Sequence, residues 1–116
     1  MSITRHQPGK RMSMAVVHGN TVYLAGQVAT DYNGSIEKQT GEVLATIDAL
    51  LAEAGTSKSK VLSCQVILNN IADFAAMNSV YDTWIDPANP PARACIEARL
   101  AHPSLKVEII AIAALD

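Results

Sequence analysis

The sequence predicts one α+β domain spanning residues 1–116, a two-layer sandwich with two helices on one face of a mixed β-sheet. Three observations support this fold class. A chain of 116 residues has the length of a single domain. Apolar residues make up 49% of it and charged residues 17%, which indicates a globular rather than a disordered chain. The expected elements follow the order ββαβαββ, without a linker or an internal repeat.

Two short strands, residues 13–18 and 21–25, begin the expected fold. Gly19-Asn20 between them predicts a two-residue hairpin turn, because both residue types tolerate a positive φ. Gly26 ends the second strand, and residues 30–35 are turn-forming throughout.

A helix is expected between Ser35, a suitable N-cap, and Gly55, a suitable C-terminal stop. Apolar residues and one threonine recur three and four positions apart, which predicts one buried stripe. The stripe consists of Ile36, Thr40, Val43, Leu44, Ile47, Leu50, Leu51 and Ala54. Gly41 lies inside this helix and costs about 1 kcal/mol relative to alanine.

The second half of the chain contributes three strands and one helix. Residues 60–68 form a strand rich in valine, isoleucine and leucine, and residues 92–100 and 105–114 form two more. Between them, Asp73 caps a helix that ends before the proline-rich segment 86–91. One face of this helix carries Phe74, Met77, Tyr81, Trp84 and Ile85.

Two helices can cover only one face of the sheet, and the other face is too apolar to be fully wet. Its apolar positions include Ala94, Ile96, Ala98, Ile110 and Ile112. Oligomerisation is the simplest way to cover them.

Charge and composition exclude several classes of protein. A net charge of −2 disfavours a general nucleic-acid binder, and the basic group Arg5, His6, Lys10 and Arg11 is interpreted as a solvated N-terminal arm. Neither a signal peptide nor a membrane span is expected, because no apolar run is long enough. Two cysteines are too few for a disulfide framework, so we expect a soluble, cytoplasmic protein.

Arg93 follows a rigid proline pair and enters the strand 92–100. Strand alternation places it on one face with Cys95, Glu97 and Arg99. A guanidinium is suited to bidentate binding of a carboxylate, so Arg93 is a candidate binding residue. A structural ion pair or a solvated polar face is the alternative interpretation.

Glu108 is the only charged residue between Val107 and Leu115, in a strand that otherwise resembles a buried one. An unpaired buried carboxylate is costly, so Glu108 is expected to be paired, protonated or placed at a cleft. A structural partner for an arginine or lysine remains an alternative.

The remaining reactive side chains give weaker signals. Cys95 has no local histidine or cation that indicates an activated thiolate, so a small buried hydrophobe is the simpler interpretation. His6, His18 and His102 show no metal-ligand spacing, and no metal site is expected.

Several segments, taken together and in order, resemble the RidA (YjgF) family of reactive-intermediate deaminases. These are Pro91–Glu97, Leu105–Ile109, Ala25-Gly26-Gln27-Val28, and Asp73–Asn78 followed by Tyr81. The likeness extends from about residue 13 to residue 114.

The resemblance implies a chorismate-mutase-like fold and a homotrimer, with a central β-barrel and active sites between subunits. The activity it implies is hydrolysis of 2-imino and 2-enamino acids to 2-keto acids and ammonia, without a metal or organic cofactor. Arg93 would bind the substrate carboxylate, and Glu108 would orient or activate the attacking water. The backbone around Gly26, together with Cys95, would line the pocket. A monomeric form is then expected to be inactive.

Three positions depart from the family pattern, each by loss of a hydroxyl group. Met12 replaces a pocket tyrosine, Ala25 replaces the serine before Gly26, and Ala94 replaces a serine or threonine after Arg93. We therefore expect a more apolar pocket, and a different substrate preference or slower turnover. Two other functions stay open: endoribonuclease or translation-inhibitor activity, and non-catalytic binding of small carboxylates. The negative net charge makes nucleic acid an unexpected partner.

Overall fold

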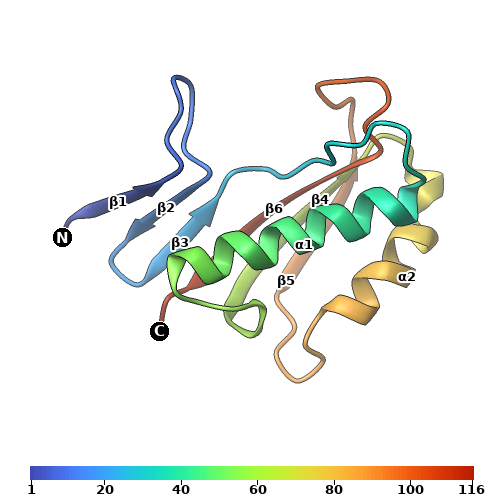
Figure 1. The fold of residues 1–116 in the computed structure, drawn as a ribbon. Coiled ribbons are helices and arrows are strands. Elements are labelled where there is room, and N and C mark those ends of the chain that lie inside the picture. The colour runs from blue at the N-terminus through green and yellow to red at the C-terminus, as the bar shows by residue number, and fades with distance from the viewer.

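The computed structural model describes all 116 residues, as one six-stranded sheet and two α-helices (Figure 1). The strands are β1 (Ile3–His6), β2 (Ala15–His18), β3 (Thr21–Leu24), β4 (Val61–Leu68), β5 (Ala92–Glu97) and β6 (Val107–Ala114). The helices are α1 (Ile36–Ala54) and α2 (Phe74–Trp84), with single 3₁₀ turns η1 (Lys58–Lys60) and η2 (Ile71–Asp73). Strand order is β1-β2-β3-β6-β4-β5, and only the β4–β5 pair is parallel. The predicted α+β class and mixed sheet are confirmed.

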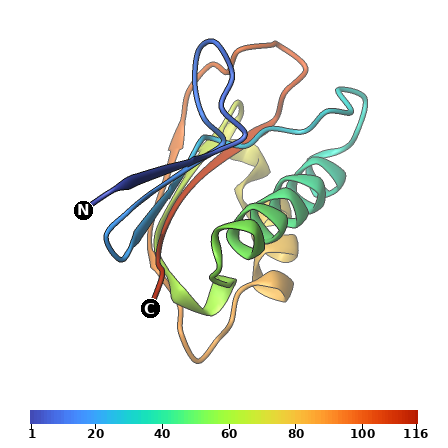
Figure 2. The same ribbon diagram turned by 60° about the vertical axis from the view of Figure 1, so that its left-hand side comes forward.

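Both helices lie on the same face of the sheet and leave the other face uncovered (Figure 2). The alternation of side chains along β6 shows the two environments. Its helix-facing residues Val107, Ile109, Ala111 and Ala113 are buried, whereas the residues between them are only half-buried. The prediction of one apolar face without a cover is therefore confirmed. Neither helix is long and apolar enough to cross a membrane.

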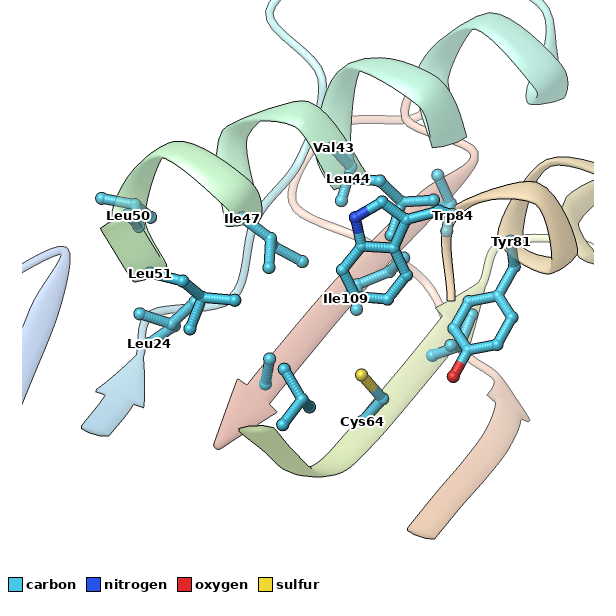
Figure 3. Packing of buried hydrophobic residues seen from close by; sticks show 14 of the residues in the cluster. Leu24, Val43, Leu44, Ile47, Leu50, Leu51, Cys64, Tyr81, Trp84 and Ile109 are labelled. Carbon is cyan, nitrogen blue, oxygen red and sulfur yellow. The ribbon is translucent and has the colours of Figure 1, made fainter. Parts of the chain in front are cut away.

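The first helix begins and ends where the sequence predicts. The Ser35 hydroxyl oxygen accepts a hydrogen bond from the backbone N–H of Lys38 at 3.2 Å. Gly55 adopts a φ of 95°, the left-handed conformation that favours glycine at a helix C-terminus. The predicted stripe on α1 packs against the helix-facing side of β6 and β3, where Leu44, Ile47 and Leu51 meet Ile109 and Leu24 (Figure 3).

The N-terminal segment differs from the prediction. Residues Ile3–His6 form strand β1, which pairs antiparallel with β2, so Arg5 and His6 do not belong to a solvated arm. The ring Nδ1 of His6 lies 3.1 Å from Oε2 of Glu53 and ties this edge strand to α1. The side chains of β1 are mostly exposed, so the segment lacks the hydrophobic alternation that reveals a strand in a sequence.

Three expectations in the second half of the chain also need correction. Asp73 occupies the N-cap position of α2 but makes no capping hydrogen bond, whereas Asn70 Oδ1 accepts one from the N–H of Ala72 in η2. Phe74 is 41% exposed and does not join the core, unlike the buried Met77, Tyr81 and Trp84. Strand β5 stops at Glu97, three residues earlier than expected, so Arg99 lies beyond it.

Gly41 offers a direct test of the first helix. A Cβ atom built on Gly41 meets no atom within 4 Å, so alanine fits there without strain. We predict that Gly41→Ala raises the free energy of unfolding by about 0.5–1 kcal/mol, because it removes the cost of glycine inside a helix. Denaturant unfolding measures this. Ala45→Gly, at an exposed position of the same helix, is the matched control and should lower stability by a similar amount. If Gly41→Ala lowered the stability, the added methyl group would have to meet other atoms, contrary to the free space around this position.

The buried thiol of Cys64, shown in Figure 3 between the sheet and the helices, gives stability a dependence on pH. Burial raises the pKa of Cys64 to about 11, although the nearby positive charge of Arg93 opposes the shift. In the unfolded chain the thiol ionises near pH ~8.5, so the unfolded state loses its proton first. The stabilisation is therefore complete below that pH and is lost as the pH rises through about 11.

We predict that the stability advantage of the wild type over Cys64→Ala shrinks by about 2–3 kcal/mol between pH 8 and pH 11. Urea unfolding at several pH values measures the two curves. Burial raises the pKa of Tyr81 to about 12, and the neighbouring Cys64 adds to this shift, so only the part of the Tyr81 contribution that comes from burial cancels between the two proteins. Cys95→Ala, which removes a half-buried thiol, is the control. The difference in unfolding free energy between the wild type and Cys95→Ala should change less with pH than the difference between the wild type and Cys64→Ala. If the stability difference between the wild type and Cys64→Ala stayed constant with pH, the Cys64 thiol would have the same pKa in the folded and unfolded states.

Candidate functional site

Arg93 is the second residue of β5, on the face of the sheet that α2 covers. Its guanidinium carbon lies 4.7 Å from the centre of the Tyr81 ring and 5.7 Å from the centre of the Phe74 ring. Nη1 of Arg93 donates a hydrogen bond to Oδ1 of Asn78 at 2.8 Å. All three contacts come from α2, so one helix determines the direction of this side chain.

No carboxylate pairs with Arg93. The only ion pair within 4.0 Å in the molecule joins His6 and Glu53. The alternative of a structural ion pair is therefore wrong for this chain. An exposed arginine with an oriented but unneutralised guanidinium can bind a carboxylate in bidentate geometry.

Glu108 is the second residue of β6, on the uncovered face of the sheet. It lies opposite Ile67 of β4 and shares this face with Ile110 and Ile112. Its carboxylate is half-buried and has no arginine or lysine within ion-pair distance, so the alternative of a structural ion pair does not hold within this chain. Glu108 is thus an unpaired carboxylate at the edge of an apolar surface.

The Glu108 side chain packs directly against Gly26. A Cβ atom at position 26 would overlap the carboxylate oxygen and lie 3.0 Å from its carbon, so a larger residue would displace Glu108. Two backbone hydrogen bonds between Gln27 and Ile109, at 2.9 and 3.1 Å, hold this segment against β6. Glycine at position 26 thus leaves room for the Glu108 carboxylate where it now lies, and a larger residue would require the end of that side chain to move.

Arg93 and Glu108 do not meet within one chain. In the sheet register Glu108 aligns with Ile67 of β4, whereas Arg93 aligns with Cys64. Two strand spacings of about 4.8 Å and three residue steps of about 3.3 Å separate their Cα atoms by roughly 14 Å. The side chains also point to opposite faces of the sheet. Arg93 and Glu108 thus mark two separate candidate half-sites on one chain.

The other predicted site residues divide between these half-sites. Cys95 lies on the same face as Arg93 and is half-buried, and burial raises the pKa of its thiol. Ala25 precedes Gly26, and its N–H donates to the carbonyl of Met14 at 2.9 Å. Met12 is 60% exposed in the loop between β1 and β2, and Ala94 lies on the uncovered face.

The sequence interpretation missed the role of Asn78 in this site and assigned Phe74 and Tyr81 only to an apolar helix face. A signal was present in the spacing. Positions 74, 78 and 81 are four and three residues apart, so they share one side of a helix. A polar amide within that stripe indicates a specific partner, which the sequence could not identify.

A hollow of about 310 Å³ lies beyond the ends of β4 and β5 and is lined by Asn69, Arg99, Leu100 and Pro103. It contains neither Arg93 nor Glu108. Arg99, which strand alternation placed beside Arg93, is thus separated from the candidate site.

Comparison with known proteins gives consistent matches over nearly the whole chain. Residues 3–115 match the family described as Endoribonuclease L-PSP. A RutC family protein of Haemophilus ducreyi is 45% identical over 114 residues, which cover 98% of this chain and 97% of that protein.

Solved structures agree with this match. The crystal structure of a YjgF family member from Neisseria meningitidis superposes with a TM-score of 0.97 at 40% identity, covering 100% of this chain and 97% of that one. A protein of unknown function from Yersinia pestis, described as belonging to the conserved Rid family, has a TM-score of 0.84 at 30% identity. That match covers 92% of this chain and 90% of the other.

Proposed function

The chain belongs to the YjgF/RidA family, whose members are also described as endoribonuclease L-PSP and RutC proteins, and we propose that it hydrolyses 2-imino and 2-enamino acids. In this reaction a 2-imino acid and one water give a 2-keto acid and ammonia. The observation that carries the proposal is the Arg93 guanidinium, which is oriented by neutral contacts and has no anionic partner. Such a group suits the carboxylate that every 2-imino acid carries.

Glu108 supplies the second requirement of the proposed reaction. A carboxylate without a cationic partner can accept a proton from water as the oxygen attacks the C2 atom of the imine. Glu108 passes this proton to the imine nitrogen, which gives a tetrahedral amino alcohol at C2. Glu108 then takes the proton of the new hydroxyl group and transfers it to the amine, so that the C2=O double bond forms as the C–N bond breaks and ammonia leaves. Arg93 stays on the carboxylate throughout and holds C2 in place. The close contact of Gly26 with Glu108 supports a fixed position for this carboxylate.

The two half-sites support an active site built from two copies of the chain. Arg93 of one copy and Glu108 of another can meet only if the subunits pack through the uncovered face and its edges. A mostly apolar hollow of about 380 Å³ opens on that face and reaches Arg93. Its lining includes Gln65, Ala94, Ile110 and Ile112 as well as Cys64 and Arg93. Ile96, on the same face, is 44% exposed. We propose the homotrimer, with its central barrel and chorismate-mutase-like architecture, that the family resemblance implies.

Loss of three hydroxyl groups supports a preference for imines with apolar side chains. Met12 and Ala25 stand on loops at the end of the sheet where Glu108 lies, and neither offers a hydroxyl donor. A site built to bind a polar group loses affinity when its donors are absent.

RNA cleavage has only the family description in its favour, and the net charge of −2 speaks against a polyanionic substrate.

We predict that the protein accelerates the decay of imines released by an amino-acid oxidase or a pyridoxal-phosphate-dependent dehydratase. Arg93→Ala should lower kcat/KM by about 10²-fold, because charge-assisted hydrogen bonds to the carboxylate are lost. Glu108→Gln should lower kcat more than it weakens binding of 2-ketobutyrate. Ammonia release and loss of imine absorbance measure turnover.

Arg99→Ala is the matched control, since Arg99 is exposed and lies outside the proposed site. Full activity in Arg93→Ala would contradict the proposal. So would an inactive wild type that cleaves single-stranded RNA instead.

We predict that Arg93→Ala and Glu108→Gln subunits restore activity when co-expressed or refolded together. Random mixing gives mixed trimers in about three quarters of cases, each with one intact site of three, so about a quarter of wild-type activity should return. The measurement is imine hydrolysis by the mixture against each variant alone. An inactive mixture that contains folded mixed trimers would contradict an active site shared between two subunits.

A further inference from the structure

The direction of the Arg93 side chain depends on one stripe of α2. Phe74, Asn78 and Tyr81 line this side of the helix, and each contacts the guanidinium. The guanidinium carbon lies over the Tyr81 ring, 4.7 Å from its centre, and Asn78 Oδ1 accepts a hydrogen bond from Nη1. A cation over an aromatic ring is stabilised without losing its charge.

The stripe itself is well fixed. Tyr81 is buried, and its ring lies 5.7 Å from that of Trp84, beside it on α2 (Figure 3). The indole N–H of Trp84 donates a hydrogen bond to Oδ1 of Asp48 on α1 at 2.9 Å. The side of α2 that contacts Arg93 is therefore held in place by contacts between both helices.

All three contacts are neutral. Arginine has five N–H donors, and Asn78 accepts only one of them, so most stay available to a ligand. An aspartate has nearly the same shape as asparagine, but it would add a negative charge at hydrogen-bond distance from Arg93. It would then compete with any carboxylate that approaches the guanidinium.

We propose that Asn78 and Tyr81 are positioning residues, which fix the direction of the Arg93 guanidinium while leaving its charge free for a substrate carboxylate. The inference rests on the proposed function for the identity of the ligand. The orientation of Arg93 can be tested without any ligand. An uncharged side chain at position 78 is thus a condition for carboxylate binding, and the amide oxygen of Asn78 fixes the direction of the guanidinium.

The experiment compares Asn78→Asp with Asn78→Ala by calorimetric titration of 2-ketobutyrate. If position 78 only fills space, the isosteric aspartate should perturb binding less than alanine. If the amide keeps Arg93 free, aspartate should weaken binding by about tenfold or more, and alanine by only a few fold. Ser79→Asp adds the same charge at an exposed position of α2 and is the matched control, with binding close to that of the wild type.

A second measurement needs no ligand. Rotation about the Nε–Cζ bond of Arg93 can be followed by ¹⁵N NMR, and Asn78→Ala should accelerate it because the hydrogen bond to Nη1 is lost. Equal rates in the wild type and Asn78→Ala would overturn the positioning role, as would stronger binding by Asn78→Asp than by Asn78→Ala. Failure of the wild type to bind 2-ketobutyrate would overturn the proposed function, while faster rotation in Asn78→Ala would still support positioning.

Discussion

The alternation of side chains along β6 is the constraint on which most of this structure depends. This strand lies between β3 and β4, and its buried side chains form part of the surface against which α1 packs. The other set faces the uncovered side and includes Glu108. A shift of one residue would expose Ile109 and place Glu108 beneath the helices, where an unpaired carboxylate is costly. The hydrophobic core therefore fixes the position of the candidate catalytic carboxylate.

The two candidate groups are supported in different ways. The position of Glu108 depends on the sheet. Its carboxylate packs against Gly26, and the backbone hydrogen bonds between Gln27 and Ile109 hold that segment beside β6. Arg93 stands on the edge strand and depends on α2 for its direction. Neither support neutralises its charge. Neither group has an oppositely charged partner within the chain, and Glu108 borders the uncovered apolar face.

Local sequence patterns were sufficient for much of the fold. Ser35 and Gly55 marked the ends of α1, and strand alternation assigned Arg93 and Cys95 to one face. The same alternation identified the apolar face that no helix covers. Local patterns failed where tertiary contacts compensate for a weak signal. Strand β1 has exposed side chains and is held by pairing with β2, and β5 ends at Glu97, whose carboxylate accepts a hydrogen bond from the N–H of Ile71.

By itself, the sequence determined the fold class, the main helices and strands, and the two residues with the chemistry of a site. It could do so because periodicity and capping are properties of neighbouring residues. Only the tertiary structure decided that Arg93 and Glu108 lie on opposite faces, and that Asn78 and Tyr81 hold Arg93. These relations depend on strand order and on the packing of α2 against the sheet. Both are contacts between distant segments, which no local pattern specifies.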